Sequence, residues 1–274
     1  MTRILSQSIY PSVMPGFGDD GYQRINEGVR RVYQKVLRPD TIVDMKFVPR
    51  STYWTSHAHL ELFNNTEIFK SILEAESEDY DAVFVRCGNH PAVREAREAI
   101  ARPVVGMTEA ALHMACQLGS KVAVVGVDDK SRPFVERVLR LSGLESRAIH
   151  RPVCTPPGQE FYQLVQQGPD WFDTPGFLEE KVLPHFEATA KECIADGAEI
   201  IITACALYSS LSLIGYNRIS GTQVGVLEGM SVAIKQAEML GELYRSTGLS
   251  TSKHLTYRSD LTEELRGQLM ADFL

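Results

Sequence analysis

Two of the five cysteines in this chain share one sequence context, and that context could support acid–base chemistry. Cys87 ends the run Asp81-Ala-Val-Phe-Val-Arg-Cys87, and Cys205 ends the run Glu199-Ile-Ile-Ile-Thr-Ala-Cys205, 118 residues later. One thiolate can remove a proton from a carbon acid while a second thiol returns a proton to the opposite face. The pair therefore predicts Cys87 and Cys205 as catalytic residues that need no cofactor and no metal.

The residues that follow each cysteine are expected to supply free backbone amides. These residues are Gly88, Asn89, Ala206 and Leu207. Pro91 suits the first position of a helix, so the amides before it would lie at a positive helix end. Such amides lower the pKa of a neighbouring thiol and hold the oxygen of a developing enolate. His90, three residues after Cys87, could stabilise a thiolate or a bound carboxylate.

Strands and helices alternate along the chain, which predicts an α/β fold with mainly parallel sheets. The expected strands are Arg3–Ile9, Ile42–Val48, Ala82–Arg86, Pro103–Val105, Lys121–Val127, Ala148–Pro152, Glu199–Thr203 and Gln223–Leu227. The expected helices are Tyr22–Leu37, Thr66–Ala75, Pro91–Ile100, Met107–Leu118, Arg132–Leu141, Gly176–Ala195 and Gly229–Tyr244. Ligands of parallel sheets bind beyond the carboxyl ends of strands, where both cysteines are expected to lie.

The 118-residue offset also aligns the first strand of each half, which indicates an internal repeat of two similar halves. We expect a first lobe of residues 1–118 plus 224–246 and a second lobe of residues 119–223. A loop at 154–175 interrupts the second lobe. Residues 247–274 form a C-terminal extension whose apolar spacing, at Leu261, Leu265, Leu269 and Phe273, predicts a terminal helix.

Composition narrows the class of protein. The chain has 274 residues and a formal net charge of −7, which argues against nucleic acid or an anionic membrane as partner. No apolar run approaches the roughly 20 residues of a membrane span, and the N-terminus lacks signal-peptide features. The odd number of cysteines argues against a disulfide scaffold, with Cys116 and Cys193 expected in helices of the core and Cys154 in a loop. We expect a cytoplasmic protein that binds a small-molecule substrate and forms a homo-oligomer.

The stretches around both cysteines resemble the aspartate/glutamate/hydantoin racemase superfamily, and most closely its hydantoin and allantoin racemase branch. The runs are Cys87-Gly-Asn-His-Pro-Ala-Val-Arg-Glu, Arg102-Pro-Val-Val-Gly-Met-Thr-Glu, Asp196-Gly-Ala-Glu-Ile-Ile-Ile-Thr-Ala-Cys205 and Gln223-Val-Gly-Val-Leu-Glu-Gly-Met-Ser. The resemblance covers residues 79–130 and 192–240. It implies two Rossmann-like (flavodoxin-like) halves with a cofactor-free site in the cleft between them. It also implies that Cys87 and Cys205 form the catalytic pair of a racemase.

Three departures from the hydantoin branch fall where substrate should bind. That branch usually has Phe-Gly-Asp-Pro after its first cysteine, Ala-Gly-Met after its second and Asn-Pro-Asn after its first strand. This chain has Gly-Asn-His-Pro, Ala-Leu-Tyr and Ser6-Gln7-Ser8-Ile9-Tyr10-Pro11 in those places. We expect Ser6, Gln7 and Asn89 to hold carbonyl or carboxylate oxygens, with a hydantoin-like ring as the first substrate.

Other functions remain open alternatives. Maleate isomerases and arylmalonate decarboxylases of the same superfamily need one cysteine, and a non-catalytic binding protein could use the same frame. Two matched thiols favour racemisation or isomerisation.

Two further motifs have simpler interpretations. Gly16-Phe-Gly-Asp-Asp-Gly21 matches a dinucleotide-binding pattern, but its aspartates would repel a pyrophosphate. His57 and His59 lack a third metal ligand, so their loop is expected to shape the substrate pocket, with Tyr53 stacking on a ring.

Overall fold

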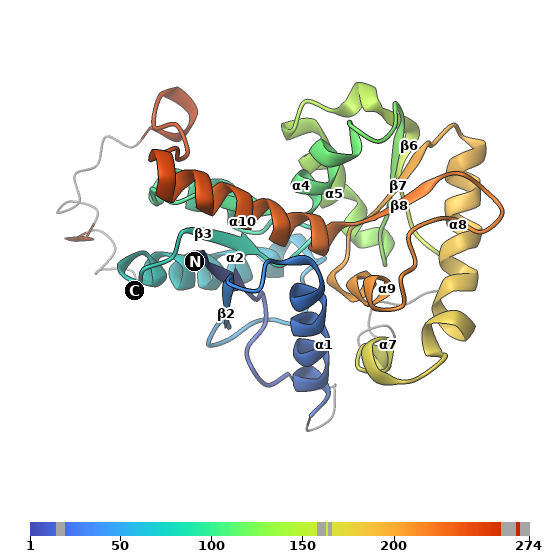
Figure 1. The fold of residues 1–274 in the computed structure, drawn as a ribbon, viewed down its shortest axis with the longest axis horizontal. Helices are drawn as coiled ribbons and strands as arrows, with labels where there is room; N and C mark the ends of the chain where they lie inside the picture. Colours follow the sequence, from blue (N-terminus) through green and yellow to red (C-terminus); the bar gives the residue numbers. More distant parts are fainter. Residues whose placement is uncertain (15–19, 158–162, 164–165, 259–266, 269–274) are drawn as a thin grey trace.

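The computed structural model describes residues 1–14, 20–157, 163, 166–258 and 267–268. Within these residues the chain forms two four-stranded parallel sheets, with strand orders β2-β1-β3-β4 and β6-β5-β7-β8. The identical order of the two sheets confirms the predicted duplication, and each sheet forms the centre of one lobe (Figure 1). The eight strands are β1 Arg3–Gln7, β2 Ile42–Lys46, β3 Ala82–Val85, β4 Val104–Gly106, β5 Val122–Val125, β6 Ala148–Cys154, β7 Ile200–Thr203 and β8 Gly225–Glu228.

All eight strands match the predicted ones, and the central strands were the clearest because strands buried on both faces have apolar runs without polar alternation. The central strands β3, β5 and β7 are buried along their whole length. In register, Leu5 of β1 lies beside Val83 of β3, and Ala123 of β5 lies beside Ile201 of β7. The strands that precede the two cysteines, β3 and β7, therefore occupy the same position in each sheet.

Helices cover both sheets. They are α1 Gly21–Val36, α2 Ala58–Glu74, α3 Val93–Ala99, α4 Met107–Ala115, α5 Arg132–Leu141, α7 Asp170–Asp173, α8 Leu183–Ala195, α9 Ser210–Leu213 and α10 Gly229–Thr247. A π-helical turn, η4 Leu178–Val182, precedes α8, and short 3₁₀ turns are η1 Ala75–Ser77, η2 Asp129–Ser131, η3 Glu145–Arg147, η5 Ala206–Ser209 and η6 Leu255–Tyr257. Helix α2 begins eight residues before the predicted Thr66.

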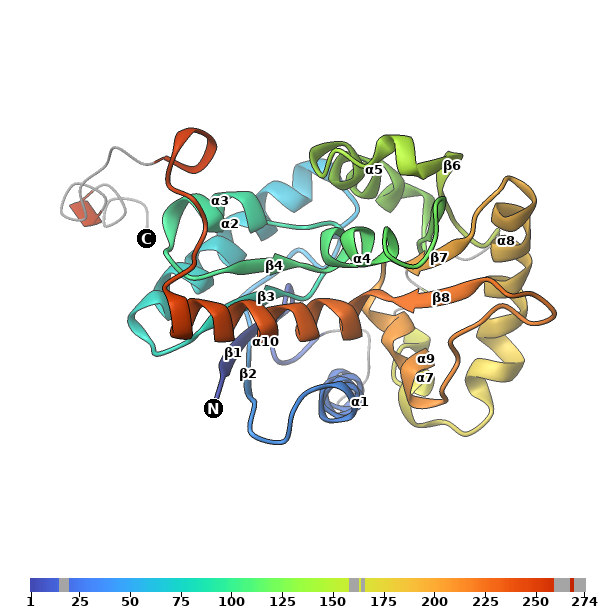
Figure 2. The same ribbon diagram turned by 45° about the horizontal axis from the view of Figure 1, so that its top comes forward.

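The two lobes exchange a helix. Helix α4 follows β4 of the first sheet, yet its Ala111, Leu112 and Ala115 pack in a cluster with β5 and β7 of the second. Helix α10 follows β8 of the second sheet and returns across β1, β3 and β4 of the first (Figure 2). The pairing of β8 with β7 corrects the expected boundary, because residues 225–228 belong to the second sheet and only α10 returns. The crossed helices tie the lobes together on one side.

Helix α1 ties the lobes together on another side. Its Gly28 lies so close to Phe172 of α7 that an added Cβ would be 2.2 Å from that ring. Arg24 of α1 forms an ion pair with Asp173, at 2.6 Å, and Arg31 donates a hydrogen bond to the Phe172 carbonyl. The first helix is therefore held between the lobes, where one face can line the space between the two sheets.

Several sequence features lie partly or wholly outside the described residues. The predicted terminal helix at 260–273, most of the glycine motif before Gly21 and part of the 154–175 segment fall in this class. Cys154 is the last residue of β6 and is buried, where we had expected a loop. Among the described residues, no helix is long and apolar enough to cross a membrane.

Candidate active site

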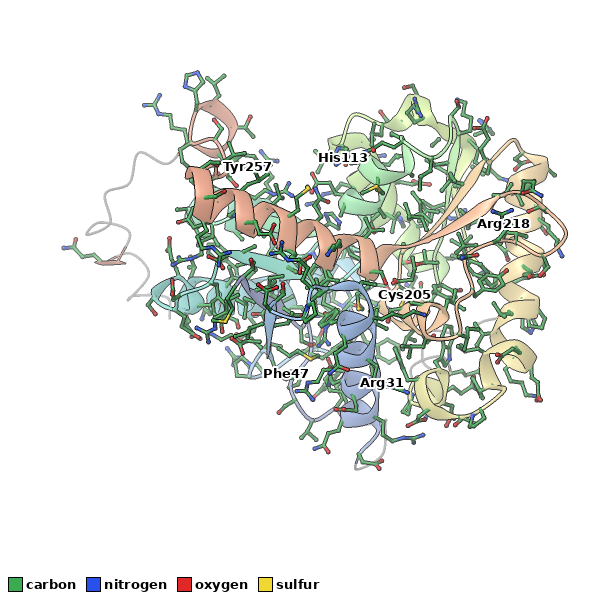
Figure 3. All side chains as sticks on the ribbon, viewed as in Figure 1. Arg31, Phe47, His113, Cys205, Arg218 and Tyr257 are labelled. Carbon is green, nitrogen blue, oxygen red and sulfur yellow. The ribbon has the colours of Figure 1, made fainter. Side chains whose placement is uncertain are left out.

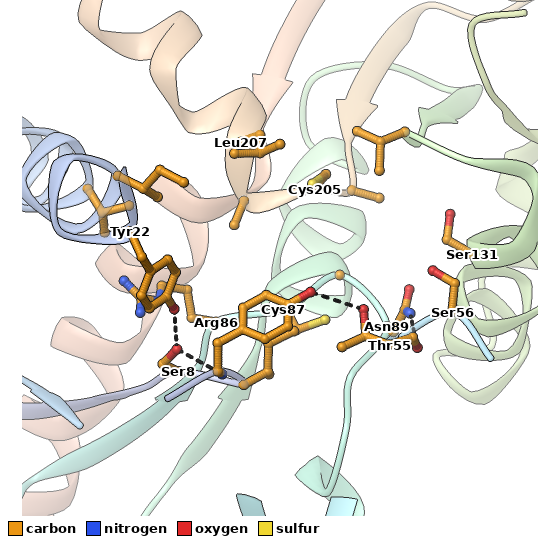
Figure 4. Close-up of a pocket in the computed structure, with 18 of the residues that line it drawn as sticks. Ser8, Tyr22, Thr55, Ser56, Arg86, Cys87, Asn89, Ser131, Cys205 and Leu207 are labelled. Atoms are coloured by element: carbon orange, nitrogen blue, oxygen red, sulfur yellow. Dashed lines mark hydrogen bonds between the residues drawn. The ribbon is translucent and has the colours of Figure 1, made fainter. Parts of the chain in front are cut away.

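A cavity of about 820 Å³, counted with its open mouth, lies between the carboxyl ends of the two sheets. The first lobe contributes the residues after β1 and β3 and one face of α1, and the second lobe contributes the residues after β5 and β7. Both Cys87 and Cys205 line it, with Cys205 located where the lobes meet (Figures 3 and 4). The structure thus brings together the two thiols that the repeat singled out.

A glycine sets the approach of the two cysteine loops. An added Cβ on Gly88 would be 1.8 Å from the carbonyl oxygen of Ala204, the residue before Cys205. The Gly88 carbonyl in turn accepts a hydrogen bond from the Thr108 hydroxyl at 2.9 Å. Only a residue without a side chain lets the backbones of the two lobes approach this closely.

Burial controls the ionisation of both thiols. It raises the pKa of Cys87 to about 12, although the Asn89 amide opposes the rise. It also raises the pKa of Cys205 to about 12, against the amides of Leu207 and Ala206. The predicted amides therefore act in the expected direction, but desolvation outweighs them, so the pKa of each thiol is raised and not lowered.

The two cysteines precede different local structures. Cys205 directly precedes the 3₁₀ turn η5, which accounts for its two amide donors. The segment after Cys87 is a turn in which His90 and Ala92 both have positive φ, and α3 begins only at Val93. The predicted helix start at Pro91 is therefore wrong, and Asn89 supplies the amide from a turn.

Ser6 and Gln7 do not line the cavity, contrary to expectation. The Ser6 hydroxyl is hydrogen bonded to Tyr33 of α1 at 2.8 Å, and the side-chain amide oxygen Oε1 of Gln7 accepts a hydrogen bond from the Ser71 hydroxyl of α2 at 2.8 Å. Because Ser6 and Gln7 are still within β1, their side chains contact the helices that cover the two faces of the sheet. Ser8, the first residue past the strand, lines the cavity in their place.

Tyr53 and His90 also fall outside the cavity lining. Tyr53 lies in the loop before α2 with a φ of 63°, and its neighbours Thr55 and Ser56 line the cavity instead. His90 is turned away, with Nε2 accepting the Glu109 amide at 3.0 Å. Burial lowers the pKa of His90 to about 4, so it is neutral at neutral pH and carries no charge for a thiolate. The remaining predicted site residues, Gly88, Asn89, Ala206 and Leu207, all line the cavity.

Sequence reasoning gave no individual role to a further group of residues that line the cavity. They are Tyr10, Tyr22, Asn26, Thr55, Ser56, Arg86 and Ser131. The Tyr22 hydroxyl is hydrogen bonded to Ser8 at 2.6 Å, and the Ser56 hydroxyl donates to Asp128 of the second lobe at 2.9 Å. Tyr10 lies in the segment after the first strand, and Thr55 and Ser56 lie in the loop after the second, both of which the sequence placed at the substrate. Arg86 offered a further signal, since a charged residue interrupts the apolar run before Cys87.

Known proteins share both this sequence and this fold. The model of a family described as Asp/Glu/Hydantoin racemase matches residues 18–237. The chain is 30% identical to a hydantoin racemase of Rhizobium meliloti over 192 residues, which cover 68% of this chain and 69% of that one. The chain belongs to the Asp/Glu/hydantoin racemase family. This racemase is accordingly an isomerase.

Solved structures show the same fold for this racemase. The allantoin racemase from Klebsiella pneumoniae superposes with a TM-score of 0.75 at 20% identity, covering 99% of this chain and 98% of that one. The allantoin racemase from Pseudomonas fluorescens gives a TM-score of 0.72 at 24% identity, covering 95% and 99%. The two-lobed parallel architecture is thus shared along almost the whole racemase chain.

The described histidines of the racemase, and its other three cysteines, do not line this cavity. Within the described ranges no three His, Cys, Asp or Glu side chains are grouped so as to hold a metal ion. His57 and His59 instead contact each other edge to face, with ring centroids 6.2 Å apart. Cys193 is fully buried in α8 and hydrogen bonded to Cys154, and the Cys116 thiol donates to the Leu112 carbonyl.

The raised pKa values predict how the cavity thiols react with an alkylating agent. A thiol whose pKa lies near 12 gains thiolate continuously as the pH rises, whereas an ordinary thiol near 8.5 is saturated by about pH 10. We expect the iodoacetamide rate constants of Cys87 and Cys205, read by peptide mass spectrometry, to rise about tenfold per pH unit from pH 8 to 10. A cysteine peptide is the control, and levelling of both rates below pH 9.5 would contradict the pKa assignment.

The contact at Gly88 predicts a loss of stability. Gly88→Ala should lower the free energy of unfolding by about 1–3 kcal/mol, because the added methyl forces the lobes apart. Gly225→Ala is the matched control, since its nearest neighbour would be an ordinary 3.5 Å away. Urea unfolding measures both variants, and equal stabilities would show that the lobes do not depend on this approach.

Proposed function

We propose that this protein racemises a small carbonyl or carboxylate compound without a cofactor, with a hydantoin-like ring as the first substrate. Cys87 and Cys205 act as acid and base from opposite lobes. The observation that carries the proposal is that both thiols, one from each half of the duplicated fold, line the same buried cavity. Relatives named hydantoin racemase and structural neighbours named allantoin racemase support a cyclic ureide as substrate class.

The proposed chemistry moves one proton at a time. The thiolate of one cysteine takes the proton from the carbon next to a carbonyl, and the C–H bonding pair moves into the carbonyl to form an enolate. The thiol of the other cysteine then gives its proton to the opposite face of that carbon. The two cysteines exchange protonation states in each turnover, so the reverse reaction uses the same pair with exchanged roles.

Backbone amides would stabilise the charged states of this cycle. The amides of Ala206 and Leu207 already favour the thiolate of Cys205, and the amide of Asn89 favours that of Cys87. In a buried cavity these fixed dipoles act with little screening by water. An enolate oxygen formed between the two loops would meet the same amides.

Polar hydroxyls at the cavity would orient the ring. Burial raises the pKa of Tyr10 far above its ordinary value, so its phenol keeps its proton and can donate to a substrate oxygen. Tyr10 also contacts Thr55, at 3.5 Å, and its backbone amide donates to Ser8. The apolar side chains of Ile25, Val29 and Leu207 line the same cavity and suit the non-polar part of a ring or its substituent.

The test is exchange of the substrate proton in D₂O. Each enantiomer of a 5-substituted hydantoin is incubated with enzyme, and the signal of the ring C–H is followed by NMR together with chiral chromatography. Cys87→Ser and Cys205→Ser should each lower racemisation by about 10²–10⁴-fold, because each removes one proton-transfer group. Cys116→Ser is the matched control, since this half-buried thiol of the first half does not line the cavity.

The outcomes separate the alternative functions. Wild-type racemisation in both serine variants would rule out the two-thiol mechanism. Loss in only one variant would favour the single-cysteine chemistry of a decarboxylase or a cis–trans isomerase. Ligand-induced thermal stabilisation with no chemical change in the wild type would favour a binding protein.

A further inference from the structure

Arg86 places a positive charge at the proposed active site. It directly precedes Cys87 at the end of β3, it is only 5% exposed, and it lines the same cavity as both thiols. In Figure 4 its side chain lies beside Tyr22 and Ser8, on the side of Cys87 away from Ser56 and Ser131. The cavity therefore has one cationic end.

Three contacts hold the guanidinium in place. Its Nη1 donates to Asn26 of α1 at 2.9 Å, and its central carbon lies 5.9 Å from the centre of the Phe47 ring. Arg86 also contributes to the hydrogen bonding of the Tyr22 hydroxyl. The side chain is thus fixed between β3 and α1 before any ligand binds.

The charge lacks a counter-ion in the part of the chain that the structure describes. Nη2 of Arg86 is buried without a hydrogen-bond partner, and none of the ion pairs among the described residues includes Arg86. The buried carboxylate of Glu228 is used elsewhere, because it accepts the amides of Met230 and Ser231 at the start of α10. A buried cation without a partner is costly, and a guanidinium matches the geometry of a carboxylate.

The opposite end of the cavity lies near a negative charge. There the Ser56 hydroxyl donates to Asp128, which also accepts the amides of Lys130 and Ser131. A negative group of the substrate would be repelled by this aspartate and attracted by Arg86. The two ends therefore orient an asymmetrically charged substrate across the thiol pair.

We propose, on the basis of the racemase function above, that the substrate carries a carboxylate on the substituent of its reacting carbon and that Arg86 binds this carboxylate. The substrate class is an acidic 5-substituted hydantoin. Ser8, Tyr22 and Asn26 line the cavity as well, with the hydroxyls of Ser8 and Tyr22 hydrogen bonded to each other and Asn26 bonded to Arg86. Arg86 is thus the residue that selects acidic over neutral side chains.

The experiment compares hydantoin-5-acetic acid with its neutral isostere hydantoin-5-acetamide and with 5-methylhydantoin. We measure kcat/KM for C–H exchange in D₂O and the Kd by calorimetry. Wild-type enzyme should prefer the acid over the acetamide at least tenfold in both quantities. In Arg86→Met this preference should fall at least tenfold, and Arg86→Lys, which keeps the charge but not the planar fork, should retain part of it.

Arg102→Met is the matched control. Arg102 is a half-buried arginine of the same lobe that donates to the backbone carbonyls of Tyr80 and Glu76, away from the cavity. In Arg102→Met, the preference for the acid over the acetamide, in kcat/KM and in Kd, should equal that of the wild type. If Arg86→Met does not fold, the wild-type ratio and the Arg86→Lys variant still decide the question.

Failure of this inference is distinguishable from failure of the proposed function. Exchange of 5-methylhydantoin without a preference for the acid overturns the role of Arg86 and leaves racemisation standing. Tight, Arg86-dependent binding of the acid with no exchange of any compound supports the carboxylate site and overturns racemisation. An unchanged acid-to-amide ratio in Arg86→Met also overturns the role of Arg86.

Discussion

The approach of the Gly88 backbone to the carbonyl of Ala204 is the contact on which the cavity and its two thiols depend. It lies between the segments that carry Cys87 and Cys205, so it sets how far apart the two sheets hold their carboxyl ends. The exchanged helices α4 and α10 and the wedged helix α1 keep the lobes from separating elsewhere. Since the lobes are joined from several sides, the space between them is preformed.

Burial has two opposing consequences at this site. It raises each thiol pKa from 9 to about 12, which amounts to about 4 kcal/mol against ionisation in the resting enzyme. The same low dielectric strengthens the fixed amides beside each sulfur and keeps the Tyr10 phenol protonated. A site of this kind keeps its thiols largely protonated until a substrate enters.

Charge is distributed unequally around the thiols. Arg86 lies at one end of the cavity, and Asp128, capping η2 and hydrogen bonded to Ser56, lies near the other. Arg86 directly follows β3 of the first lobe, and Asp128 directly precedes η2 of the second. In the mechanism that we propose, this distribution orients a substrate by its charge while the cysteines act on either face of one carbon.

The sequence by itself determined the strands, the duplication and the cysteine pair, because buried parallel strands have apolar runs and Cys87 and Cys205 follow matching ones. Only the tertiary structure decided which neighbours reach the cavity. Ser6 and Gln7 are still within β1 and contact helices on its two faces, whereas Ser8 is past its end. The return of α10, the raised thiol pKa values and the burial of Arg86 without an ion pair depend on residues distant in sequence, which no local pattern records.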